Sequence, residues 1–238
     1  MKPTYVTMLL AFVLFSCAPL RNLQDAKLDA PILGAIGKEN KSIVNKNFQQ
    51  IGQPTMVNPV AISVQEIPFS KSAFKEYRNH KTERGYKVDL VYVDSLPVKT
   101  KYLRLEIKDK IGLMAMLNNS TNEEVRSYLE KDKDCRIVSS ISLYMPSIER
   151  DMLGHAPEVF LSTNNNGSLQ IELVNGRERQ LLSLPEDEIF DYGVMGFCWG
   201  EDIYGNARIE TLNDRGGCPY RTEKSAQKLG DNKSYLKL

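Results

Sequence analysis

The sequence predicts an α+β fold, built mainly from an antiparallel β-sheet with three or four short helices. Two observations lead to this prediction. Alternating apolar and polar residues recur in about eight short segments, which is the pattern of strands that bury one face. Short connections rich in turn residues separate most of these segments, and short connections favour antiparallel pairing.

The first predicted strand and the first predicted helix follow each other along the chain. Apolar residues alternate with small or polar ones over residues 60–65, which predicts a strand. Ser70 is a suitable helix N-cap, and Phe69 and Phe74 have the spacing of a hydrophobic staple. We therefore expect a helix over residues 70–82.

Two further short helices are expected before the middle of the chain. Asp109 can cap the first of them, which would place Ile111, Met114 and Leu117 on one apolar side. The second begins with capping-box spacings within residues 120–124. A helical turn is also expected over residues 146–153.

The other strands are predicted from the same alternation and from turn signals. Asn175-Gly176 is the strongest hairpin signal, because both residue types accept positive φ. The remaining strands are expected at residues 86–93, 101–108, 135–145, 159–163, 169–173, 177–184, 194–199 and 207–212.

The N-terminus predicts export. Lys2 precedes an apolar run of about eight residues, whereas a bilayer-spanning helix needs about 20. Leu14-Phe15-Ser16-Cys17 resembles a bacterial lipobox. This resemblance implies removal of residues 1–16, a diacylglycerol on the Cys17 thiol and a membrane anchor made of at least two acyl chains. The alternatives are an ordinary signal peptide with a chance cysteine, or a buried N-terminal helix.

The chain after the signal peptide divides into a tether and one domain. Residues 17–58 contain the lipidated cysteine and a stretch rich in Pro and Gly, so we expect a mostly irregular tether with at most a weak helix over residues 42–50. Residues 59–238 form the predicted single α+β domain with a short polar C-terminal tail. This domain is long enough to bury a core, since hydrophobic residues make up 42% of the chain.

The charge balance argues against two classes of partner. Lys2 is the only charged residue of the signal peptide, so the mature chain carries 30 cationic and 30 anionic side chains. A neutral chain is a poor candidate for nucleic-acid binding, which needs a basic surface. The sequence also lacks the polybasic cluster that would hold a protein to anionic lipid.

The cysteines suggest one disulfide and no metal centre. Export would place Cys198 and Cys218 where disulfides persist, and the loop between them is about 20 residues. Cys135 would then be a buried thiol, although pairings that involve Cys135 remain open. Without a CxxC motif, and with only two histidines, the sequence predicts no metal or cofactor.

No motif assigns a catalytic residue. His155 lies near Asp151 and could act as a general base, but a single hydrogen-bonded loop histidine gives the same pattern. His80 lies at the polar end of the predicted helix and is expected to be a solvated surface group. The acidic run over residues 186–191 could bind Ca²⁺ but lacks the ordered spacing of a calcium loop, so a solvated turn is expected. Paired carboxylates for glycoside hydrolysis leave no local signature.

The sequence resembles uncharacterised lipoproteins of Bacteroidota. The resemblance is carried by the lipobox, by residues 102–117 and by Phe197-Cys198-Trp199 with Cys218-Pro219, and Asp94-Ser95-Leu96 resembles the O-glycosylation signal of that phylum. It implies localisation at the outer membrane. Surface-exported lipoproteins of that phylum tend to carry an acidic stretch after the lipidated cysteine, and residues 18–22 are not acidic, so the resemblance implies a domain that faces the periplasm. We expect an envelope protein that binds a partner protein or envelope component. The alternative is a periplasmic hydrolase whose site is assembled only in the fold.

Overall fold

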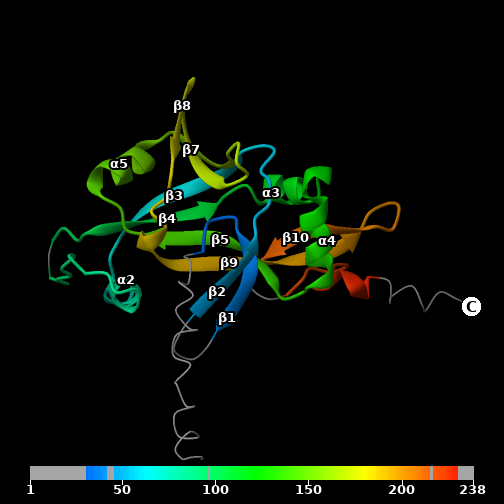
Figure 1. Ribbon diagram of the computed structural model, residues 1–238, viewed down its shortest axis with the longest axis horizontal. Helices are drawn as coiled ribbons and strands as arrows, with labels where there is room; N and C mark the ends of the chain where they lie inside the picture. Colours follow the sequence, from blue (N-terminus) through cyan, green and yellow to red (C-terminus); the bar gives the residue numbers. More distant parts are fainter. Residues whose placement is uncertain (1–30, 42–45, 96, 215–216, 230–238) are drawn as a thin grey trace, which may run out of the picture.

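The computed structural model describes residues 31–41, 46–95, 97–214 and 217–229 (Figure 1). Within these residues ten strands form one sheet, and four α-helices lie around it. The α+β class with mainly antiparallel pairing is therefore confirmed. The strands are β1 (Ile36–Lys41), β2 (Lys46–Gly52), β3 (Val60–Pro68), β4 (Lys101–Ile107), β5 (Cys135–Leu143), β6 (Glu158–Thr163), β7 (Leu169–Asn175), β8 (Glu178–Leu182), β9 (Ile189–Glu201) and β10 (Ala207–Asn213). The helices are α2 (Lys71–Glu83), α3 (Lys110–Leu117), α4 (Glu123–Lys131) and α5 (Ser147–His155).

Strand β5 organises the sheet. The strand order is β10-β9-β5-β4-β3-β6-β7-β8, and β1 pairs with both β5 and β2. One edge of β5 pairs with β9, while its other edge pairs with β1 at its start and with β4 near its end. The β1–β2 hairpin therefore leaves the sheet at the start of β5 and projects away from the other strands (Figure 1).

Local signals set the first helix as predicted. The Ser70 hydroxyl accepts a hydrogen bond from the Ala73 backbone N–H at 3.1 Å and caps α2. The Phe69 and Phe74 rings lie 6.0 Å apart between centroids, so the predicted staple is present. Phe69 is buried at the centre of an aromatic cluster that joins α2 to the sheet. Its other members are Tyr77, Tyr102, Tyr144 and Phe190.

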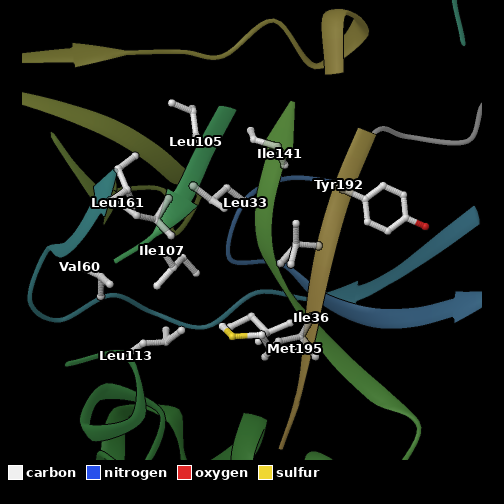
Figure 2. Packing of buried hydrophobic residues seen from close by; sticks show 14 of the residues in the cluster. Leu33, Ile36, Val60, Leu105, Ile107, Leu113, Ile141, Leu161, Tyr192 and Met195 are labelled. Atoms are coloured by element: carbon white, nitrogen blue, oxygen red, sulfur yellow. The ribbon is translucent and has the colours of Figure 1, made fainter. Parts of the chain in front are cut away.

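The hydrophobic core includes a segment that precedes the predicted domain. Leu33 is fully buried, and Figure 2 shows it among Ile107, Ile141 and Leu161. Gly34 makes this approach possible: its φ is +85°, and a Cβ there would lie 2.7 Å from Leu161 Cδ2. Such a backbone position favours glycine.

The tether prediction is too long at its C-terminal end. Residues 31–58 were predicted as part of the tether, whereas their described part contains β1 and β2 and contributes to the core. The prediction of a weak helix over residues 42–50 is also wrong, because strand β2 begins at Lys46. Residues 1–30, which hold the predicted signal peptide and Cys17, lie outside the described residues. In the part that is described, no helix is long and apolar enough to cross a membrane.

Two other predictions differ from the structure for identifiable reasons. Residues 86–93 alternate in burial but form no strand. They pack along α2 instead, with the Tyr92 ring stacked on Phe74 at 5.3 Å. In α3, Ile111 is 76% exposed rather than buried. The side chain of Asn118 exchanges two hydrogen bonds with the backbone of Ile209 in β10, at 2.8 and 3.0 Å, and so fixes which side of α3 faces the core.

Candidate functional site

The predicted disulfide joins Cys198 of β9 to Cys218, with sulfur atoms 2.02 Å apart. A second connection follows it. The backbones of Trp199 and Glu223 exchange two hydrogen bonds, at 2.7 and 2.9 Å. The disulfide and this backbone pair together hold residues 217–229 against β9. The C-terminal segment therefore has a fixed place beside the sheet.

Cys135 is a free thiol buried at the start of β5. Burial, aided by the charge of Asp132, raises the pKa of Cys135 to about 11. Since the thiolate is the reactive form of cysteine, this thiol is poorly suited to nucleophilic chemistry at neutral pH.

The two histidines occupy different helices and different environments. Burial, together with the charge of Arg84, lowers the pKa of His80 to about 4, and its Nε2 lies 3.3 Å from the Asp187 carbonyl oxygen. His155 is exposed at the end of α5, with Nδ1 2.8 Å from the Asp151 carbonyl oxygen. A carbonyl can only accept, so Nδ1 of neutral His155 carries the proton and Nε2 is the basic nitrogen.

The acidic run is part of the helix–sheet contact. Glu188 forms an ion pair with Lys81, whose side chain is buried in α2. Throughout the described ranges, no group of three or more His, Cys, Asp or Glu residues could hold a metal ion.

A cleft of about 340 Å³, here called the basic cleft, lies beside the disulfide. It is bordered by the β1–β2 hairpin, by the turn before β5 and by the C-terminal segment. Its cationic lining residues are Lys46, Lys133, Arg136 and Lys224, and its carboxylates are Glu39 and Asp214. Among the described residues of the lining, four cations against two carboxylates give a positive excess.

Two glycines of β9 line the basic cleft. A Cβ added at Gly193 would lie 2.6 Å from Ser140 Oγ, so this glycine permits the close approach of β5 and does not open the cleft. A Cβ added at Gly196 would lie 3.6 Å from Arg136 Nε, so the guanidinium group lies next to this glycine. Glycine inside a strand commonly marks such a close approach.

Arg136 is held by its own turn. Its Nη1 donates to the carbonyl oxygens of Lys133 at 2.8 Å and Cys135 at 2.7 Å. The described residues supply no partner for Nε or Nη2 of Arg136. These two nitrogens form one edge of the guanidinium plane, the fork that can bind two oxygens of a carboxylate or phosphate.

The lysines of the basic cleft differ in whether their ammonium groups have partners. Lys46 has two: its ammonium group lies 3.4 Å from Asp191 Oδ1, in an ion pair, and 4.0 Å from the centroid of the Tyr192 ring, in a cation–π contact. Lys133 and Lys224 are exposed, and their ammonium groups have no partner within the described part of the chain. The basic cleft therefore presents three cationic groups to a ligand, one of them with a fixed orientation.

A second hollow contains His155. Its volume is about 550 Å³, and it lies between the end of α5 and the β7–β8 hairpin. Its lining residues are Met152, His155, Ala156, Pro157, Leu173, Val174, Asn175, Glu178, Arg179 and Gln180. It brings the predicted histidine near a carboxylate, Glu178, but none of these lining residues carries a hydroxyl or thiol nucleophile.

The sequence predicts the disulfide but not the basic cleft. Lys133 and Arg136 belong to a chain whose charges balance, and Lys224 lies almost 90 residues further along the chain. The available signal is Gly196, which lies inside the strand predicted over residues 194–199 and two residues before Cys198. Comparison with protein-family models, with curated proteins and with solved structures finds no match for this chain.

Proposed function

We propose that this chain is a membrane-anchored lipoprotein of the bacterial envelope that binds an envelope component in the basic cleft. The observation that carries the binding role is the cleft itself. It is lined by an oriented guanidinium group, by two lysines without partners among the described residues and by Gly196, which leaves space beside the guanidinium group. A few convergent polar groups around a hollow are typical of ligand sites.

The proposed localisation at a membrane rests on the resemblance of residues 14–17 to a lipobox. Lipid on Cys17 would keep the domain at a membrane surface, where an envelope component is present at high local concentration. The disulfide is compatible with this location, because disulfides persist in oxidising compartments.

Cross-linking in intact cells tests the binding role, and metabolic fatty-acid labelling of the wild type and Cys17→Ala tests the anchor. We expect the full-length chain to capture one envelope component, and Gly196→Leu to abolish the capture by filling the basic cleft. The Gly196 backbone is not in the left-handed region. A Cβ added there would lie no closer than 3.6 Å to another atom, Arg136 Nε, so we expect the fold to tolerate leucine. Gly52→Leu is the matched control, since a Cβ there meets nothing within 4 Å and lies outside the cleft.

Two results would contradict the proposal. Equal capture by the Gly196→Leu and wild-type chains would remove the binding role from the basic cleft. Metabolic fatty-acid labelling that persists in Cys17→Ala would remove the proposed anchor.

The second candidate function is hydrolysis in the hollow that contains His155. Its support is the fixed Nδ1 proton of His155, which leaves Nε2 basic, together with Glu178 in the same hollow. Ester, amide and glycoside substrates can be screened with the wild type and with His155→Gln. Turnover that disappears in His155→Gln and persists in Gly196→Leu would favour this function over the first.

A further inference from the structure

We propose that the group bound in the basic cleft is a phosphate monoester, held by the Nε–Nη2 edge of Arg136 together with the ammonium groups of Lys133 and Lys224. This inference rests on the proposed binding function and names the chemical class of its ligand. The argument uses orientation, charge and accessibility.

The orientation argument concerns Arg136. Both hydrogen bonds from Nη1 go to backbone carbonyl oxygens of the same turn, those of Lys133 and Cys135. The guanidinium plane is therefore fixed before any ligand arrives. Its remaining edge matches two oxygens of one oxyanion, and such a fork is more specific than a single ammonium group.

The charge argument selects phosphate over carboxylate. Arg136, Lys133 and Lys224 are the uncommitted cations of the lining, and Asp214 opposes them with one negative charge. The other carboxylate, Glu39, lies 4.0 Å from Lys46. The excess is thus about two positive charges, which a phosphate monoester with a charge of roughly −1.5 to −2 neutralises better than a carboxylate does.

The accessibility argument concerns Gly196 and the disulfide. Gly196 leaves room on the face of β9 beside Arg136, because an added Cβ would lie 3.6 Å from Arg136 Nε. Cys198–Cys218 positions the chain segment that carries Lys224 on the opposite border. Lys133 and Arg136 come from the turn at the start of β5, and Lys224 comes from the disulfide-linked segment, so an oxyanion can be contacted from two segments of the chain.

NMR of the Arg136 Nε–H group tests this inference directly. The full-length lipidated chain in detergent is titrated with inorganic phosphate at constant ionic strength, with acetate as the carboxylate comparison. We expect a saturable shift of the Arg136 Nε–H signal with phosphate, and weaker binding of acetate. Arg136→Lys should weaken phosphate binding about tenfold or more, since a charge-assisted fork is replaced by a single point charge.

Surface variants keep the test independent of folding. Lys133→Gln and Lys224→Gln change exposed side chains without partners among the described residues, and each should weaken phosphate binding severalfold. Lys75→Gln and Lys108→Gln are matched controls, because both lysines are exposed and lie outside the basic cleft. Equal loss in the controls, or no loss in either cleft variant, would overturn the assignment.

Two soluble monoesters distinguish the source of the phosphate group. Tighter binding of glycerol 3-phosphate supports a lipid headgroup, and tighter binding of glucose 6-phosphate supports a phosphorylated glycan. Acetate that binds as tightly as phosphate, or a phosphate titration without a saturable shift, overturns the phosphate assignment. If capture in cells still depends on Gly196, the proposed function survives that failure. If neither phosphate binding nor capture depends on the basic cleft, both proposals fail.

Discussion

Replacing Asn122 with alanine tests how the segment before β3 is held to the domain. Asn122 is 1% exposed and lies just before α4. Its Nδ2 donates to the carbonyl oxygens of Thr55 at 2.9 Å and Met116 at 3.1 Å. Its Oδ1 accepts from the Thr55 N–H at 2.8 Å. One side chain therefore joins the chain before β3 to the end of α3.

The magnitude follows from these three hydrogen bonds. A neutral hydrogen bond contributes about 1 kcal/mol net. Asn122→Ala removes all three bonds, and water can replace the acceptor of the Thr55 N–H because Thr55 is exposed. We expect the free energy of unfolding to fall by about 3 kcal/mol, a large part of the 5–15 kcal/mol typical of a domain.

Equilibrium unfolding in urea, followed by circular dichroism, measures this loss. Asn165→Ala is the control, because Asn165 is exposed in the β6–β7 turn and should change stability by less than about 0.5 kcal/mol. Hydrogen exchange adds a local readout, since the Thr55 amide should lose protection in Asn122→Ala. A loss below about 1 kcal/mol with an unchanged m-value would refute the assigned role of these bonds.

The remaining predictions concern the cysteines and His80. Replacing Cys198 and Cys218 together with alanine should lower the free energy of unfolding by about 3 kcal/mol, because the disulfide closes a separation of 20 residues. Chemical denaturation measures this loss, and an unchanged denaturation midpoint would contradict the prediction. Burial raises the pKa of Cys135 to about 11, so this thiol should resist alkylation at neutral pH until urea unfolds the chain. Mass spectrometry of the Cys135 peptide measures the alkylation, and rapid labelling of the native protein would disprove the predicted protection. The pKa of His80 is about 4 when folded and 6.5 in its ordinary state, so the unfolded chain binds the proton more tightly. Its contribution to stability is present above pH 6.5 and is lost as the pH falls towards 4, by at most about 1.4 kcal/mol per pH unit. Unfolding curves of the wild type and His80→Gln should therefore diverge in this window, and parallel pH profiles would exclude the effect.

The sequence was sufficient wherever a short stretch carries its own structural information. The Ser70 cap, the Asn175-Gly176 turn and the alternation in β4 each depend on residues within one turn or one strand. The disulfide was also accessible, because two cysteines in one late, glycine-rich stretch left few competing pairs. In each case the physical cause is a backbone preference or a short chain closure.

Partner-dependent features needed the tertiary structure. Residues 86–93 have the alternation of a strand, but their neighbour is α2 rather than another strand. Strand β2 has a mostly exposed, polar sequence with Phe48 as its buried residue, so its membership of the sheet depends on pairing with β1. Hydrophobic periodicity reports which side chains are buried, and it does not identify what covers them.

The basic cleft shows the same division at the level of the site. Sequence composition determined that the charges of the chain nearly balance. Only the sheet decided that Arg136, Lys133 and Lys224 border one hollow, because β5, β9 and the disulfide-linked segment are brought together by pairing over long sequence separations. Local residue preferences determine the secondary structure of each segment, whereas the electrostatic potential at a site depends on which segments the fold brings together.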